Sequence, residues 1–200
     1  MKEEILFRDI KEHLLGLTSK QFDRRAILIN EMSQLESEQK DCFSCSGMCC
    51  TYEFNSMLIT PIECFELLNY LVLENRINED LFIKLNDNIN DFRLDREIYL
   101  GNNKEFRRYY TCPFFKDQNK GCSISRSAKP YGCLGFNPKE KIVNSKGKCS
   151  SNQVLLEKRH HDFSSSEKDA NVYLSKILGL YWEKKPIPVA LREFLIKLKF

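Results

Sequence analysis

The chain has 200 residues and a mass of 23.6 kDa, which suits one globular domain with a single apolar core. Hydrophobic residues make up 42% and charged residues 30%, with only 8 glycines and 6 prolines, so the composition excludes disordered and fibrous classes. The net charge of +3 is unevenly placed, because residues 104–148 hold 11 basic side chains against 3 acidic ones. Nine cysteines are too many to be incidental core residues.

The beginning of the sequence has no pattern typical of a secretory signal. Met1 is followed by charged residues and an amphipathic pattern rather than by a continuous apolar segment. No apolar run approaches the ~20 residues needed to cross a bilayer. We therefore expect a cytoplasmic protein with no membrane partner, in which thiols are kept reduced. The odd number of cysteines agrees, since nine cannot all pair within one chain.

Helical periodicity covers residues 4–39 in two pieces. Apolar side chains recur at three- and four-residue spacing as far as Leu17, residues 16–19 supply a break, and the pattern resumes at Ala26. The pattern stops at Lys40. The segment therefore predicts two consecutive helices before the first cysteines.

Two more helices are expected in the middle of the chain. Thr60 can cap the first of them, Pro61 suits its first turn, and Glu63 can close a capping box. This helix should continue to about Glu74. The next should begin at Asn78, after which apolar residues again recur at helical spacing.

The periodicity fails between residues 98 and 148, where short extended pieces at 106–115 and 121–124 alternate with turn residues. The tail from residue 153 returns to helix, with an interruption at 186–188. We therefore predict a mainly α fold with irregular, short-stranded, metal-bound segments, its helices packed around a cysteine cluster.

These elements are expected to form a single domain over residues 1–200. Helical segments at 1–40 and 150–200 would flank a metal-binding core at about 41–138, which holds most of the cysteines.

Four cysteines lie within nine residues, in the pattern C-x2-C-x3-C-C: Cys42, Cys45, Cys49 and Cys50. A C-x2-C pair can turn two thiolates toward one metal ion, and Gly47 lets the chain bend back so that the later cysteines join them. Buried thiols of the ordinary kind would be spread along apolar faces instead. The crowding therefore indicates a metal site.

The second cluster is sparser and contains Cys112, Cys122 and Cys133. It lies in the segment without helical periodicity, where metal bonds could contribute folding free energy directly. Cys64 follows Pro61 on a predicted helix and is expected in the core. Cys149 could be an additional ligand or a free thiol.

These motifs carry a resemblance to a known family. The C-x2-C-x3-C-C string, the later Cys112-Pro113-Phe114-Phe115 and Cys122-Ser123-Ile124, and residues 129–136 occur in the order typical of the bacterial YkgJ-type cysteine-cluster family of zinc- or iron-chelating domains. The resemblance implies that the metal ligands are Cys42, Cys45, Cys49, Cys50, Cys112, Cys122 and Cys133. The chain departs from the family pattern at Lys129 and Leu134, where arginines are usual.

Seven candidate thiols exceed the four that a structural zinc ion needs. Either two metal ions share bridging thiolates, or an iron–sulfur cluster is accompanied by further thiols, and the spacing favours the iron–sulfur cluster slightly. We predict a metal-binding protein without evident catalytic machinery, since no phosphate-binding loop or nucleophile motif is present and the carboxylates are expected on helix surfaces.

Two other functions fit parts of the sequence. Flagellin lysine N-methylases contain a related cysteine motif, so an iron–sulfur-dependent enzyme of that kind is one alternative. A zinc-stabilised nucleic-acid-binding module is another, because aromatic and basic residues interleave at 106–110 within the basic segment. The more common explanation of such a stretch is a strand with one buried face, so we rank nucleic acid below a metal ion as the partner.

Overall fold

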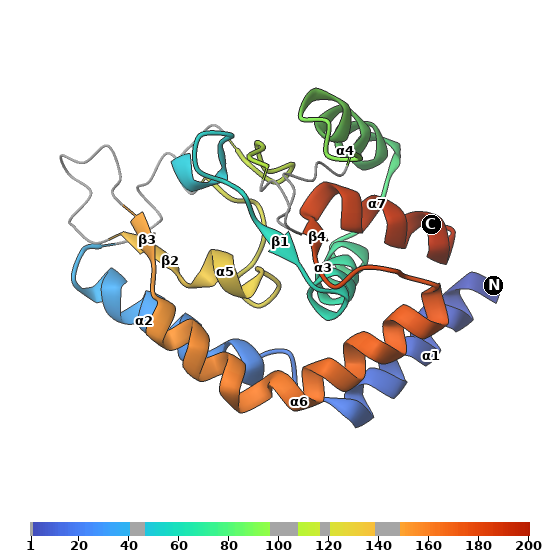
Figure 1. The fold of residues 1–200 in the computed structure, drawn as a ribbon, viewed down its shortest axis with the longest axis horizontal. Coiled ribbons are helices and arrows are strands. Elements are labelled where there is room, and N and C mark those ends of the chain that lie inside the picture. Colours follow the sequence, from blue (N-terminus) through green and yellow to red (C-terminus); the bar gives the residue numbers. More distant parts are fainter. Residues whose placement is uncertain (1, 41–46, 97–107, 117–120, 139–148) are drawn as a thin grey trace, which may run out of the picture.

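The protein is mainly helical, as predicted, in a computed structural model that describes residues 2–40, 47–96, 108–116, 121–138 and 149–200 (Figure 1). The helices are α1 (Lys2–Leu17), α2 (Asp23–Ser37), α3 (Pro61–Leu73), α4 (Glu79–Asp91), α5 (Tyr131–Leu134), α6 (Gln153–Leu178) and α7 (Ile187–Leu198), with a short 3-10 turn, η1 (Met48–Cys50). The strands are β1 (Leu58–Ile59), β2 (Phe136–Pro138), β3 (Cys149–Ser151) and β4 (Lys185–Pro186).

The two predicted N-terminal helices are confirmed as α1 and α2, and the break between them falls at residues 18–22. The 26-residue helix α6 lies along both of them (Figure 1). Because α6 also contacts α3 and α7, it joins the two N-terminal helices to the rest of the fold.

The predicted starts of α3 and α4 are also confirmed. The Thr60 hydroxyl accepts a hydrogen bond from the Glu63 amide while the Glu63 carboxylate accepts one from the Thr60 amide, which completes a capping box. The Asn78 side chain accepts a hydrogen bond from the amide of Leu81 at 3.0 Å. These caps satisfy amides that a helix leaves without partners in its first turn.

The predicted interruption at residues 186–188 is wrong in its position. Helix α6 ends at Leu178 and is capped by Gly179, whose φ of 60° lies in the left-handed region that suits a glycine after a helix. The chain then leads through β4 into α7, with Pro188 in the first turn of that helix, where its missing amide costs nothing. The prolines therefore begin a helix rather than interrupt one.

The main apolar core lies between α3, α7 and parts of α1, α4 and α6. Several of its side chains are fully buried, among them Leu68, Leu85, Leu191 and Phe194. Cys64 belongs to this core and is also fully buried, which confirms its predicted place. Strands β1 and β4 pair antiparallel beside the core. None of the described helices combines the length and the apolar character that a membrane crossing requires.

The predicted extended pieces at 106–115 and 121–124 form no strand in their described parts. A single antiparallel bridge joins Phe115 to Cys122, and the rest is irregular chain. Two elements in the irregular region were not predicted, the one-turn helix α5 and the strand β2, which pairs antiparallel with β3. Helix α5 has a single turn, and β2 has three residues whose partners lie in β3, so neither is long enough for a helical or alternating periodicity to mark it in the sequence.

Candidate thiol site

A glycine turn folds the first cysteine-bearing loop back on itself. Gly47 precedes η1 with a φ of 76°, a left-handed conformation that favours glycine, and its carbonyl oxygen accepts a hydrogen bond from the Cys50 amide at 2.8 Å. A Cβ atom at Gly47 would lie 2.6 Å from the Cα atom of Gly121 and 2.9 Å from the Phe115 ring. Glycine is therefore needed both for the turn and for the close approach of a second loop.

Backbone contacts bring Cys112 and Cys122 to that loop. The amide of Cys112 donates a hydrogen bond to the carbonyl oxygen of Cys50 at 2.7 Å. The bridge between Phe115 and Cys122 then returns the chain toward Cys112. Three segments that are distant in the sequence thus meet at Cys50.

Tyr110 anchors the segment that leads to Cys112. Its backbone exchanges hydrogen bonds of 2.9 Å with Asn55, whose side-chain amide donates to the Tyr110 carbonyl oxygen. Its hydroxyl donates to the carbonyl oxygen of Met57 at 2.6 Å and accepts a bond from the Ile187 amide at 3.1 Å. Because Tyr110 is fully buried, it is not available to stack on bases, whereas Tyr109 beside it is exposed, and residues 106 and 107 lie outside the described ones.

The thiols themselves are in contact. The Cys50 side chain lies within hydrogen-bonding reach of the side chains of Cys49, Cys112 and Cys122. Cys133 lies close enough to Cys112, Cys122 and Cys49 for their charges to act on it. The structure therefore brings together five of the seven predicted site residues, from four separate segments of the chain.

The contacts shift the pKa values of the thiols in opposite directions. Hydrogen bonds to Cys112, Cys122 and Cys49 raise the pKa of Cys50. The hydrogen bond from Cys50 lowers the pKa of Cys122 to about 6, against desolvation, and also lowers that of Cys49. The ammonium group of Lys129 favours both thiolates as well.

The remaining cysteines are not placed in this group by the described residues. Cys42 and Cys45 lie outside the described residues, and Cys149 is half-buried in β3, opposite Pro138. Burial raises the pKa of Cys64 well above its ordinary value, as expected of an unreactive core thiol. Within the described ranges, no three or more Cys, His, Asp or Glu side chains are arranged to hold a metal ion.

A second polar cluster, here called the buried ionic network, joins α2, α3 and α6. Arg24 and Arg25 on α2 both pair with Glu66 on α3, with 2.7 Å between Arg25 Nη1 and Glu66 Oε2. On α6, Arg159 pairs with Glu167, whose carboxylate also lies 3.5 Å from Arg24 Nε. None of the five side chains is more than 10% exposed. Breaking one partner of such a buried pair costs about 3–5 kcal/mol.

Sequence reasoning missed this network because it placed the carboxylates on helix surfaces. A usable signal was present: Arg24, Leu28 and Met32 are spaced four residues apart and therefore share one helix face, and all three are buried. Glu167 similarly precedes the buried Ala170 by one turn on α6. A charged residue that continues an apolar stripe indicates a buried ion pair.

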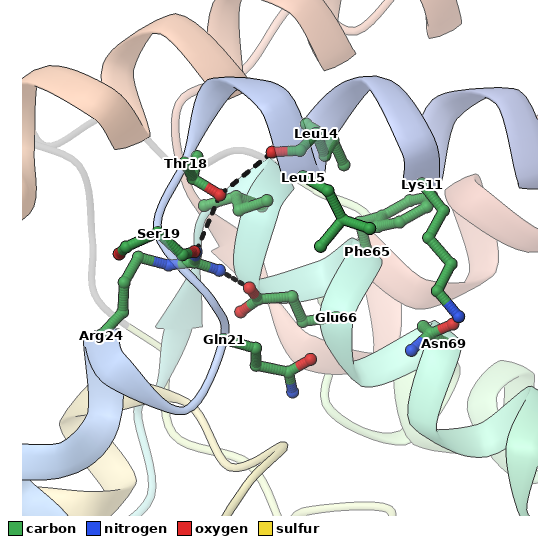
Figure 2. Close-up of a pocket in the computed structure, with 11 residues that line it drawn as sticks. Lys11, Leu14, Leu15, Thr18, Ser19, Gln21, Arg24, Phe65, Glu66 and Asn69 are labelled. Atoms are coloured by element: carbon green, nitrogen blue, oxygen red, sulfur yellow. Dashed lines mark hydrogen bonds and ion pairs between the residues drawn. The ribbon is translucent and has the colours of Figure 1, made fainter.

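A small cavity of about 70 Å³ lies beside the network between α1, α2 and α3 (Figure 2). Figure 2 shows the Arg24 guanidinium group directed toward Glu66 and toward the end of α1. There Arg24 Nη1 donates to the Thr18 hydroxyl at 2.8 Å, and that hydroxyl donates to the Leu14 carbonyl oxygen. No cysteine lines this cavity, so it is separate from the thiol site.

No protein-family model, curated protein or solved structure matches the chain. The resemblance of its cysteine motifs to the YkgJ-type family therefore stays a prediction, and the thiol site must be interpreted from its own chemistry.

Proposed function

We propose that the protein binds zinc or iron through its clustered cysteines. The observation that supports this most directly is the contact of Cys50 with three other thiols. Cys49 lies in the same loop, whereas Cys112 and Cys122 come from separate segments of the chain. Thiolates are the ligands that zinc, copper(I) and iron–sulfur clusters prefer. In a reducing compartment clustered cysteines stay as thiols rather than forming disulfides, so a thiophilic metal is the ligand that suits them.

The surroundings of the thiols fit such an occupant. Each coordinated thiolate carries a negative charge, and the cations of Lys129 and Arg76 act on Cys122. Arg76 is held in place by hydrogen bonds of 2.8 and 2.9 Å to the backbone and side chain of Ser123. These cations offset part of the charge that several thiolates would bring together.

The described thiols alone do not form a complete set of metal ligands. In this proposal Cys42 and Cys45 complete it, with Cys49, Cys50, Cys112, Cys122 and Cys133. Seven thiolates would serve two zinc ions with bridging ligands, or an iron–sulfur cluster with additional thiols. We favour the iron–sulfur cluster, on the spacing of the first four cysteines.

Anaerobic purification followed by metal, sulfide and absorption analysis tests the proposal. We expect iron with acid-labile sulfide, or zinc, at one or more equivalents per chain. Cys50→Ala should lose most of this metal because it removes the thiol at the centre of the contacts. Cys64→Ala is the matched control and should keep the metal, since Cys64 lies in the apolar core.

Wild-type protein that carries none of iron, sulfide and zinc at a stoichiometric level would refute the proposal. Equal metal loss in Cys50→Ala and Cys64→Ala would show that the metal depends on general folding rather than on the thiol site.

A further inference from the structure

The turn that carries Cys133 rests on the buried ionic network. Arg25 Nε donates a hydrogen bond to the carbonyl oxygen of Lys129 at 2.9 Å. The amide of Tyr131 donates to Glu63 Oε1 at 2.9 Å, so the same carboxylate that completes the cap of α3 also holds this turn. Both contacts are made by backbone atoms of the turn. They therefore fix the path of the chain and not only the position of a side chain.

The side chain of Tyr131 forms the second connection. Its hydroxyl donates to Glu167 Oε1 at 2.6 Å, and its ring lies under two guanidinium groups, with Arg159 Cζ 3.3 Å and Arg25 Cζ 4.7 Å from the ring centroid. Tyr131 is only 7% exposed. One aromatic residue thus touches members of the network on both α2 and α6.

The positive and negative charges of the network balance only when Glu63, which bonds the turn, is counted. The guanidinium groups of Arg24, Arg25 and Arg159 face the carboxylates of Glu66 and Glu167, and Glu63 contributes the third negative charge. A network that served only to join helices would not need Glu63, whose remaining oxygen bonds the turn.

The thiol lies two residues beyond this attachment. The Cys133 amide donates to the carbonyl oxygen of Pro130 at 3.0 Å, which closes the turn. On its other side, a Cβ atom at Gly132 would come within 2.5 Å of the Met57 side chain, so the turn is also confined there. A shift of Tyr131 would therefore move Cys133 relative to Cys112 and Cys122.

We infer that Tyr131 is a positioning residue for the metal site, which places Cys133 among the other thiols by fixing its turn on the buried ionic network. The effect on metal affinity rests on the proposed function, whereas the effect on the turn does not. Changes among groups that orient a ligand typically reduce metal affinity 10–100-fold.

Two measurements on Tyr131→Leu test this inference. In the metal-free protein, amide hydrogen exchange of residues 129–135 should rise at least tenfold. In the loaded protein, competition with a chromophoric chelator should show zinc affinity reduced about tenfold or more. The control is Phe194→Leu, which lowers stability within the apolar core of α7 without touching the turn. It should change neither quantity.

Tyr131→Phe covers the case in which Tyr131→Leu does not fold. It keeps the ring beneath Arg159 and removes the hydroxyl, which donates to Glu167 and accepts a hydrogen bond from Arg24 Nε at 3.3 Å, so we expect a several-fold rise in exchange of the turn and a partial recovery of zinc affinity relative to the leucine variant.

The outcomes separate the two proposals. If wild-type protein binds neither zinc nor iron, the proposed function fails, and the exchange data still decide whether Tyr131 holds the turn. If wild-type protein binds metal and the Tyr131 variants behave like Phe194→Leu in both measurements, the inference is overturned and the network serves only to join helices.

Discussion

The helical half of the molecule and its thiol-bearing half are stabilised by different interactions. Around α3 and α7, apolar side chains are buried almost completely, and hydrophobic burial needs little directional precision. Around η1 and α5, the chain is short and irregular, and single hydrogen bonds, ion pairs and glycine positions determine its path. The contrast indicates that damage to the first half should unfold the protein, whereas damage to the second should alter the site first.

The largest effect is expected in the apolar half. Phe194→Ala removes a fully buried ring from α7 and should lower the free energy of unfolding by about 3–5 kcal/mol in urea denaturation. Metal bound per folded molecule should stay unchanged, since Phe194 lies on α7, outside the loops that carry the predicted ligands. Loss of metal before loss of helical signal would contradict the division into two halves.

The next effect falls in the thiol-bearing half. Gly47→Ala would force a side chain into a left-handed conformation and against Gly121, so we expect a loss of about 2–4 kcal/mol of stability, measured by urea denaturation, together with weaker metal binding.

Gly16→Ala is the matched control for Gly47→Ala. Gly16 lies in α1 with no atom near the position of an added Cβ, so alanine should raise stability by up to about 1 kcal/mol and leave metal binding as it is. Equal responses of the two glycines would remove the argument that the Gly47 loop is specifically constrained.

Tyr110 connects the two halves. Tyr110→Phe removes the hydroxyl that bonds the Met57 carbonyl oxygen and the buried Ile187 amide, and the loss of these two bonds should cost about 2 kcal/mol in urea denaturation. Hydrogen exchange should rise both at the start of α7 and at residues 108–116. A rise on one side only would show that the halves are not coupled through this residue.

The smallest effect compares two thiols. In metal-free protein, alkylation of Cys122 followed by mass spectrometry should slow about tenfold between pH 7 and pH 5, because its thiolate persists down to a pKa of about 6. Cys64 should stay unmodified over the same range, since it is fully buried. Because folding lowers the pKa of Cys122, its contribution to stability is present above the ordinary pKa of 9.0 and is lost as the pH falls through about 6. A Cys122 rate that does not change with pH would contradict the hydrogen bond from Cys50.

The helical half was the more predictable from sequence, for a physical reason. Caps at Thr60 and Asn78 and the periodic apolar residues act locally, so the sequence determines them within one or two turns of helix. The end of α6 was misplaced because a proline was taken as an interruption, although Gly179 supplied the stronger stop.

The thiol-bearing half depends on contacts between distant residues, which no local pattern contains. Spacing alone grouped the cysteines and singled out Cys64 as a core residue. It did not reveal that the Cys112 amide bonds the Cys50 carbonyl, nor that Tyr131 rests on charged groups from two helices. Buried ion pairs escaped prediction because most charged residues on a helix face solvent.

The bond between the Tyr110 hydroxyl and the Ile187 amide has a consequence for biosynthesis. Every thiol-bearing segment precedes α7 in the chain, so all the cysteines leave the ribosome before the helix that completes the apolar core. Until Ile187 is made, the Tyr110 hydroxyl has no α7 amide to accept from. The bond that joins the cysteine-bearing segment to α7 therefore forms only after every thiol has been synthesised.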